Sequence, residues 1–189
     1  MAGAVEKIEL RKRLKKARAQ LSAQQVAASS AQAARHILAC DAYRKAACIM
    51  GYLAFGKELS VDAVLEQALA EGKTVLVPLV VSATEIVPVR LQDMQSFELD
   101  RFGIRSVRPP VEQVAAQAVE LILVPGVAFG RDGSRLGMGA GYYDRFLPKA
   151  ENALRMGIAY DGLLQEQLPR DEYDVCMQLL ASESGITTL

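Results

Sequence analysis

The amino-acid sequence predicts an α/β protein in which a mostly parallel central sheet is covered by helices on both faces. Two observations support this fold class. Segments with helical periodicity alternate with strand-like segments, and the strand-like segments are short and almost continuously apolar, as expected of strands buried on both faces. The chain has 189 residues and no change in composition or linker that would divide it. We therefore expect a single domain over residues 1–189.

The first predicted elements are two helices and a buried strand. Leucine and alanine recur at helical spacing over residues 6–21, which predicts an amphipathic helix. Ser22 and, three residues later, Gln25 form the capping-box pattern that begins a second helix over residues 23–39. The short apolar run at residues 46–54 is expected to form the first strand.

The next elements continue the alternation of helix and strand. Ser60 is the expected N-cap of a third helix, which Gly72 ends. The apolar segment 73–80 predicts a second strand, and the segment 85–91 predicts a third. Pro88 favours an edge position for this third strand, because proline has no N–H to donate to a neighbouring strand.

The second half of the chain is at first less regular. Residues 92–118 are expected to form a loop followed by a short helix. A buried strand is then expected at residues 119–124, a helix from about residue 141 and another strand at residues 154–160. The segment 179–185 is a candidate for the last strand.

The net charge is zero, but the charged residues are unevenly distributed. Residues 6–18 hold seven of the 22 basic side chains and two of the 22 acidic ones, so the rest of the chain is acidic. A basic helix on an otherwise acidic body indicates a local anionic ligand. It does not indicate a protein that binds nucleic acid over its whole surface.

The composition argues against several classes of protein. No apolar run approaches the ~18–20 residues of a membrane helix, and the first residues lack the apolar core of a secretory signal. The three cysteines (Cys40, Cys48 and Cys176) are odd in number and lack C-x-x-C spacing. We therefore expect reduced thiols and a cytoplasmic location.

The most informative segment is LILVPGVAFGRDGSRLGMGAGYYDRFL, at residues 121–147. After the buried strand come two turns and Arg135, and glycines then alternate at Gly137, Gly139 and Gly141. The backbone N–H groups of such a loop form a concavity that suits phosphate oxygens, and Arg135 adds a cation. The segment lacks the P-loop pattern, and its glycines lie too far beyond the strand for a dinucleotide fold. We expect a ligand-binding loop of another type.

Several other side chains have both a functional and a structural interpretation. Lys7 and Arg11, one helical turn apart, would clamp a polyphosphate or form a solvated face. Asp144 would bind Mg²⁺ or stabilise the start of a helix. Glu58 would accept N–H donors from a heterocycle or lie at the surface, and the local sequence of Asp174 indicates a solvated loop acid. The aromatic residues that would stack on a flat ligand or fill the core are Phe55, Tyr142 and Tyr143.

The run PGVAFGRDGSRLGMGAGYYDRFL resembles the signature of the 5-formyltetrahydrofolate cyclo-ligase family, also called 5,10-methenyltetrahydrofolate synthetases. The pair Lys7 and Arg11, the turn that ends in Glu58, the segment GKTVLVP and the late segment LPRDEYD follow in the order of that family. The resemblance thus covers nearly the whole chain. It rests mainly on the glycine signature, since the other pieces are weak by themselves.

The resemblance implies a three-layer αβα sandwich and a ligase that forms a C–N bond. The implied reaction is the ATP- and Mg²⁺-dependent cyclisation of 5-formyltetrahydrofolate to 5,10-methenyltetrahydrofolate, with release of ADP and phosphate. It would proceed through a phosphorylated formyl group, an iminium phosphate. The implied partner is 5-formyltetrahydrofolate, with or without a polyglutamate tail. We expect a monomer that binds no membrane and no nucleic acid other than ATP.

The resemblance also implies roles for individual residues. Arg135, Lys7 and Arg11 would be catalytic, and Asp144 and Asp174 would bind Mg²⁺. The implied ATP-binding residues are Lys7, Ile8, Glu9, Leu10, Arg11, Arg135, Leu136, Gly137, Met138, Gly139, Ala140, Gly141, Tyr142 and Tyr143. The implied substrate-binding residues are Leu53, Phe55, Glu58, Met138, Gly139, Ala140, Gly141 and Tyr142.

One position departs from the family pattern. Position 140 is usually glycine or lysine, and here it is Ala140. A methyl group is tolerated if φ is negative, but it offers no cation to a phosphate. We expect an effect on rate or affinity rather than on the type of reaction.

Two alternatives use the same features. A paralogue with this fold would bind a nucleotide but act on another acyl or sugar-phosphate substrate. A regulatory or RNA-binding module would use the basic first helix. The absence of interleaved aromatic residues in that helix and the acidic remainder of the chain argue against the RNA-binding module.

Overall fold

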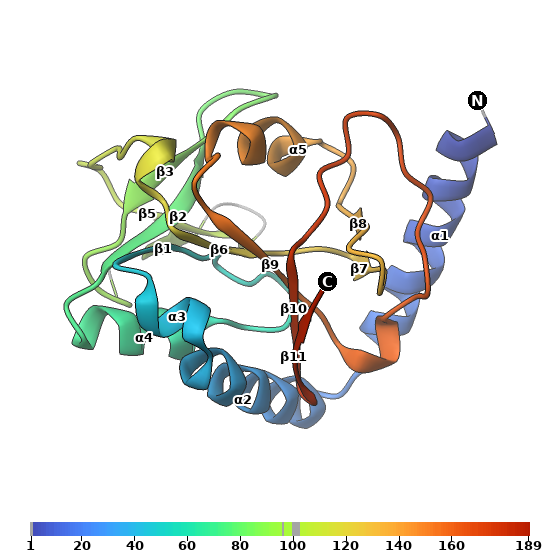
Figure 1. Cartoon of the computed structure of the whole chain (residues 1–189), viewed down its shortest axis with the longest axis horizontal. Coiled ribbons are helices and arrows are strands. Elements are labelled where there is room, and N and C mark those ends of the chain that lie inside the picture. Colours follow the sequence, from blue (N-terminus) through green and yellow to red (C-terminus); the bar gives the residue numbers. More distant parts are fainter. Residues whose placement is uncertain (1, 96, 100–102) are drawn as a thin grey trace.

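A central sheet organises the molecule (Figure 1). A computed structural model describes residues 2–95, 97–99 and 103–189, with side chains from Val5 onward. Within these ranges, seven strands form the sheet. In spatial order they are β11 (Gly185–Thr188), β10 (Leu179–Ser182), β9 (Leu154–Ile158), β6 (Leu121–Val124), β1 (Cys48–Met50), β2 (Thr74–Val80) and β3 (Ile86–Arg90).

The strands in the middle of the sheet are parallel. The pairs β10–β9, β9–β6, β6–β1 and β1–β2 are parallel, whereas β11 and β3 each pair antiparallel at an edge. The prediction of a mostly parallel sheet is therefore confirmed. Pro88 does lie on the outermost strand β3, and its carbonyl accepts a hydrogen bond from the N–H of Val114 at 3.0 Å.

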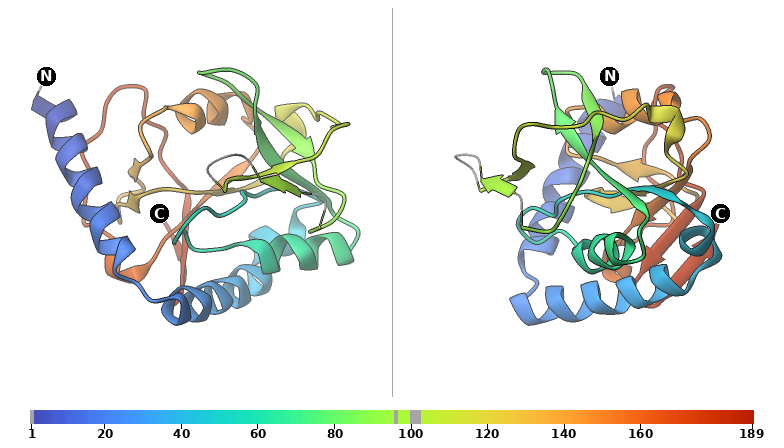
Figure 2. Two further views of the ribbon diagram at one scale, coloured as in Figure 1. Left: turned by 180° about the vertical axis from the view of Figure 1, so that it is seen from behind. Right: turned by 90° about the vertical axis from the view of Figure 1, so that its left-hand side faces the viewer.

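Alternating side chains of the buried strands enter two separate cores. Ile49 of β1 and Leu121 of β6 pack in the core that contains helix α2 (Ala23–Ala39), the short helix α3 (Asp41–Lys45) and helix α4 (Asp62–Ala70). Met50 and Ile122, their next neighbours, pack in the core that contains α5 (Tyr142–Phe146) and the 3₁₀ turns η1 (Ala116–Ala118) and η2 (Leu147–Lys149). Figures 1 and 2 show these helices on opposite sides of the sheet, so the three-layer arrangement is confirmed.

The helix predictions hold with corrections at the ends. Helix α1 (Ala2–Ala19) begins earlier than the predicted residue 6, and the Ser22–Gln25 capping box of α2 is present, with Gln25 N donating to Ser22 Oγ at 3.1 Å. The N-cap of α4 is Val61 rather than Ser60, although Ser60 Oγ accepts the N–H of Asp62 at 3.1 Å. Gly72 adopts a positive φ of 76° just beyond α4, as its role at the helix end requires.

Four local predictions are wrong or incomplete. The apolar run 46–54 forms only the three-residue strand β1, because its second half leaves the sheet as a loop. The expected loop at 92–118 contains a hairpin of β4 (Phe97–Leu99) and β5 (Arg105–Val107). The helix α3 and the antiparallel strand β11 were not predicted.

Helix α1 lies beside the sheet rather than on either face (Figure 1). Its Leu14 packs with Val127, Leu136 and Leu168, around the small hairpin of β7 (Ala128–Phe129) and β8 (Arg135–Leu136). The helix also approaches the 3₁₀ turn η3 (Asp161–Leu163). None of the described helices combines the length and apolar character needed to cross a membrane.

Candidate functional site

A cleft of about 320 Å³ lies between α1, the end of β6 and the segment 135–144. Pro125 and Gly126, which directly follow β6, form part of its wall. The cleft thus lies beyond the carboxyl end of a central parallel strand, where ligands bind in open α/β sheets. The polar and charged side chains that line it are Lys7, Arg11, Glu58, Arg135, Tyr142, Tyr143, Asp144, Asp171 and Asp174.

Backbone conformation and steric contacts explain why glycines occupy alternating positions in this loop. Gly139 and Gly141 have φ values of 109° and 69°, a region that side chains disfavour. A Cβ at Gly137 would lie 2.8 Å from Arg135 Nη1. Ala140 lies between these glycines without a positive φ, so its methyl group is compatible with the backbone. The loop around Gly137–Gly141 therefore depends on glycine at Gly139 and Gly141, whereas at Gly137 a side chain would displace the end of Arg135.

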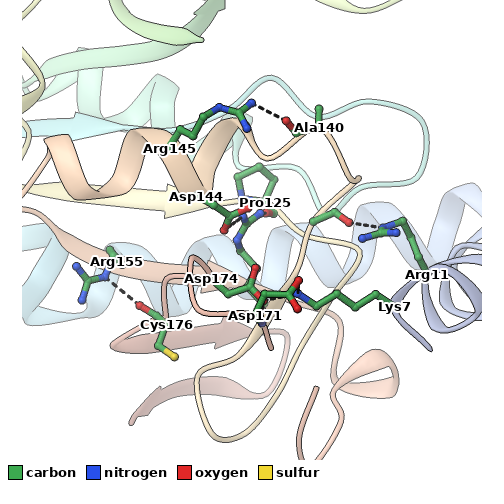
Figure 3. A network of polar contacts seen from close by, with 12 residues as sticks. Lys7, Arg11, Pro125, Ala140, Asp144, Arg145, Arg155, Asp171, Asp174 and Cys176 are labelled. Carbon is green, nitrogen blue, oxygen red and sulfur yellow. Dashed lines mark hydrogen bonds and ion pairs between the residues drawn. The ribbon is translucent and has the colours of Figure 1, made fainter. Parts of the chain in front are cut away.

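This glycine loop is also tied to its surroundings by an arginine. Arg145 Nη2 donates to the carbonyl of Ala140 at 2.6 Å (Figure 3). Arg145 Nε donates to the carbonyl of Thr84 at 2.6 Å. Tyr142 donates from its hydroxyl to the carbonyl of Ser82 at 3.3 Å. The turn between β2 and β3 therefore supports the glycine loop from outside.

Arg135 is buried at the centre of the cleft wall. It is 7% exposed, and its Nη2 donates to Asp144 Oδ1 at 2.7 Å. Its guanidinium lies 5.6 Å from the ring centroid of Tyr143. Within the described ranges, Arg135 Nε and the Tyr143 hydroxyl are buried polar atoms without a hydrogen-bond partner. Burial raises the pKa of Tyr143 above its ordinary value, so its hydroxyl stays protonated and can donate.

Lys7 joins α1 to a loop from the far end of the chain. Figure 3 shows its side chain extending to Asp171 and Asp174; Nζ lies 2.6 Å from Asp171 Oδ2 and also contacts Asp174 Oδ2. Burial alone would lower the pKa of Lys7, but the hydrogen bonds and charges of the two aspartates raise it above its ordinary value. One turn further, Arg11 Nε donates to the carbonyl of Gly137 at 2.7 Å. Lys7 and Arg11 of α1 therefore both face the cleft.

Glu58 lies at the inner end of the cleft. Its side chain is only 14% exposed, and its Oε2 accepts the N–H of Phe55 at 3.1 Å. Its Oε1 lies 3.8 Å from Nη1 of Arg18, a buried residue of α1. Glu58 is thus a largely buried carboxylate rather than the surface acid of the alternative interpretation.

Some residues of the implied binding sets do not line this cleft. Ile8 and Glu9 are exposed on other faces of α1, and Leu10 packs against the apolar cluster beneath that helix. Leu53 packs against the core, and the Phe55 side chain is 41% exposed outside the described wall of the cleft. Helical periodicity explains the first three, because only residues at intervals of about 3.6 share a face. Their implied roles stay predictions.

Two residues at the site were missed in the sequence. Asp171 pairs with Lys7, and its own N–H donates to Asp174 Oδ2 at 2.7 Å. Arg18 lies three helical turns beyond Lys7, on the same face of α1. That spacing was a signal for Arg18, whereas the sequence near Asp171 offers only its position three residues before Asp174.

The two implied metal ligands both line the cleft, but each is paired with a cation. Asp144 contacts Arg135, and Asp174 contacts Lys7. Over the part of the chain that the structure describes, no group of three or more histidine, cysteine, aspartate or glutamate side chains is arranged to hold a metal ion. The assignment of Asp144 and Asp174 to Mg²⁺ therefore stays a prediction.

Comparison with known families decides the ancestry of this site. The family model of the 5-formyltetrahydrofolate cyclo-ligases matches residues 4–182. The chain belongs to this family. Membership confirms the resemblance of the glycine signature and identifies the chain as a cyclo-ligase enzyme.

Individual relatives agree with the family assignment. The 5-formyltetrahydrofolate cyclo-ligase of Haemophilus influenzae is 30% identical over 172 residues, which cover 88% of this chain and 92% of the relative. That of Mycolicibacterium smegmatis is 32% identical over 150 residues, or 75% and 76% of the two chains. The NMR structure of Aquifex aeolicus 5,10-methenyltetrahydrofolate synthetase is 31% identical, covers 97% of this chain and 92% of its own, and superposes with a TM-score of 0.84. The cyclo-ligase fold is therefore shared.

Proposed function

We propose that this cyclo-ligase uses ATP and Mg²⁺ to convert 5-formyltetrahydrofolate to 5,10-methenyltetrahydrofolate, releasing ADP and phosphate. The observation that carries the proposal is the gathering of Lys7, Arg11 and Arg135 around one glycine loop in a single cleft. Three cations and a row of backbone amides suit a triphosphate, whose charge must be neutralised before its terminal group is transferred. Family membership supports the same reaction.

The chemistry requires activation of the formyl group. A formyl amide is a poor electrophile, because its nitrogen lone pair is delocalised into the carbonyl. In the first step the formyl oxygen forms a bond to the γ-phosphorus of ATP, and the bond from that phosphorus to ADP breaks. In the second step N10 of the folate forms a bond to the activated carbon of the iminium phosphate. The C–O bond then breaks, phosphate leaves with the electron pair, and N10 loses its proton.

The residues of the cleft perform binding and positioning in this scheme. Lys7, Arg11 and Arg135 would neutralise the phosphate oxygens, and the glycine amides would orient them. Arg135 Nε and the Tyr143 hydroxyl are donors that a bound ligand would satisfy. Holding N10 next to the activated carbon makes the second step effectively unimolecular, so no protein nucleophile is required.

The carboxylates of the cleft fit a hard divalent cation. Asp144 and Asp174 line the same cleft, and carboxylate oxygens together with phosphate oxygens are the ligands that Mg²⁺ prefers. In the nucleotide complex these two carboxylates would hold the ion while keeping their contacts with their present partners, Arg135 and Lys7. When bound, Mg²⁺ would neutralise phosphate charge beyond what the three cations supply.

The remaining expectations extend the same proposal. The enzyme would work as a monomer in the cytoplasm, and its substrate would carry one or several glutamates. Size-exclusion chromatography with light scattering tests the first point: a dimer at micromolar concentration would contradict it. Comparing kcat/KM for mono- and polyglutamylated substrates tests the second.

A coupled assay tests the reaction itself. Purified protein is mixed with 5-formyltetrahydrofolate, ATP and Mg²⁺, and the absorbance of the methenyl product is followed beside the release of phosphate. We expect one phosphate for each methenyl group formed and no product without ATP. If 5-formyltetrahydrofolate stays unchanged while ATP is consumed with another acyl substrate, the enzyme is instead a paralogue with a different substrate.

A further inference from the structure

A buried arginine of α1 lies behind the carboxylate at the inner end of the cleft. Arg18 is 9% exposed, and its Nη1 donates to the carbonyl of Gly126 at 3.1 Å. The same Nη1 lies 3.8 Å from Glu58 Oε1. Gly126 follows Pro125, whose carbonyl accepts a weak hydrogen bond from Arg135 Nη1 at 3.4 Å. Arg18 and Arg135 therefore hold the turn after β6 from its two sides.

Arg18 is one of two groups that favour the ionised form of Glu58. Burial raises the pKa of the Glu58 carboxyl above its ordinary value, and the Phe55 N–H and then the charge of Arg18 oppose part of that increase. Among the described residues, Tyr52, Tyr143 and Tyr160 also interact with the charge of Glu58, and they come from three different segments. Burial raises the pKa of each of these tyrosines, and the charge of Glu58 adds to the increase, so they stay neutral around it. Lys57, the neighbour of Glu58 in the chain, donates instead to the carbonyl of Ala19 at 2.6 Å.

A buried carboxylate held this way can accept N–H groups of a heterocycle. Glu58 lines both the cleft and a small inner cavity that Arg18, Tyr52 and Tyr160 also border. Hydrogen bonds to a charged acceptor are stronger than those to a neutral one, and an uncharged carboxyl would offer one of its oxygens as a donor instead. The charge on Glu58 therefore decides whether it can accept two N–H groups from a pterin ring.

We propose that Arg18 is a positioning residue for the folate: its buried guanidinium keeps Glu58 ionised and directed toward the inner end of the cleft. The inference rests on the proposed function, because it assigns this end of the cleft to the pterin. Arg18 acts through Glu58 and does not itself contact the reacting atoms. Its removal should therefore weaken the binding of folate in a pH-dependent way and leave the binding of ATP unchanged.

The test compares Arg18→Met, Arg18→Lys and Glu58→Gln with wild-type protein. Arg13→Met, at an exposed position of the same helix, is the matched control for loss of a positive charge. KM values for 5-formyltetrahydrofolate and for ATP are measured between about pH 6 and pH 9, a range that brackets a raised carboxyl pKa. Circular dichroism and thermal unfolding report whether each variant is folded.

The expected result is specific to folate. In Arg18→Met, the KM for folate at neutral pH should rise about tenfold and fall back toward the wild-type value as the pH rises and Glu58 ionises. Arg18→Lys, which keeps the cation, should restore most of the affinity at every pH. In Glu58→Gln the KM should be raised without pH dependence, and adding Arg18→Met should change it little, because the two residues act in series.

Three outcomes would contradict the inference. The first is a KM for folate in Arg18→Met with the same pH dependence as in wild-type protein. The others are an equal loss of affinity for ATP and additive effects in the double variant. Calorimetric binding of 5-formyltetrahydrofolate without ATP separates the inference from the proposed function. Wild-type protein that binds folate without turnover contradicts the reaction, and the pH test of Arg18 then compares calorimetric dissociation constants in place of KM values. Wild-type protein that does not bind folate contradicts both.

Discussion

The two ion-paired cations of the cleft are held in different ways. Arg135 and its partner Asp144 are nine residues apart, and their side chains are 5% and 23% exposed. Lys7 reaches across 164 and 167 residues to Asp171 and Asp174, whose side chains are 60% and 18% exposed. One side of the cleft is thus a buried pair within a single local segment. The other joins a helix at the start of the chain to one solvated and one largely buried aspartate near its end.

This difference separates stability from binding. A buried pair leaves an uncompensated charge when one partner is removed, whereas an exposed pair contributes little to the free energy of unfolding. We therefore expect Arg135 to matter for both the fold and the nucleotide. Lys7 should matter for the nucleotide and, through its largely buried pair with Asp174, to a smaller degree for the fold. The following predictions are ordered from the largest expected effect to the smallest.

Arg135→Ala should lower kcat/KM for ATP by about 10³, because it removes a preorganised charge from the transferring phosphate. It should also lower the free energy of unfolding by about 3 kcal/mol, because Asp144 loses its partner. Steady-state kinetics and urea denaturation measure the two effects. Arg135→Lys, which keeps the charge without the planar fork, should recover the stability better than the rate. An unchanged KM for ATP in Arg135→Ala would remove this residue from the nucleotide site.

Lys7→Met should lower kcat/KM for ATP by about 10²-fold, because one positive charge near the phosphates is lost. The free energy of unfolding should fall by about 2 kcal/mol, because the pair with Asp171 is solvated but the largely buried Asp174 loses its cation. Lys12→Met, at an exposed position of the same helix, is the matched control and should leave both quantities near wild type. A loss of stability as large as that of Arg135→Ala would contradict the contrast between the two sides.

Asp144→Asn and Asp174→Asn should each raise the Mg²⁺ concentration for half-maximal activity about tenfold, because a neutral amide is a weaker ligand than a carboxylate. Asp171→Asn is the control in the same loop as Asp174. It makes the same substitution at the other aspartate that pairs with Lys7. Its Mg²⁺ titration should move by less than about twofold. Equal shifts for Asp171→Asn and Asp174→Asn would mean that the loop acts only through Lys7.

Ala140→Gly should change kcat/KM for ATP by less than about twofold, because the methyl group meets no conformational penalty at this position. Gly139→Ala, one residue earlier, should lower the free energy of unfolding by about 1 kcal/mol or more, because φ there is 109°. Thermal unfolding and ATP kinetics check both variants. A rate gain of tenfold in Ala140→Gly would show that the departure from the family pattern limits this enzyme.

The side of the cleft that contains Arg135 and Asp144 could be predicted from the sequence. The side on which Lys7 meets Asp171 and Asp174 could be predicted only in part. Arg135, the three glycines and Asp144 lie within ten residues, so one motif contained both their identity and their spacing. The pairing of Lys7 with Asp174 depends on how α1 packs against the β7–β8 hairpin. No local pattern contains that information, and the family resemblance alone brought Asp174 forward.

The distinction between local and long-range information also explains the errors in the predicted fold. Buried strands such as β6 and the capping box at Ser22 were predicted correctly, because continuous apolar runs and short polar signals are local. The β4–β5 hairpin was missed because its strands have three residues each and are held from outside. Arg105 forms a two-bond ion pair with Asp62 of α4 at 2.8 and 2.9 Å.

The reach of Lys7 across the chain has a consequence for biosynthesis. The ribosome makes Lys7 167 residues before Asp174. For most of translation, the nascent helix α1 therefore carries its lysines and arginines without the two aspartates that later neutralise Lys7. A product released early, before residue 171, lacks one wall of the cleft and should have no capacity to capture a nucleotide.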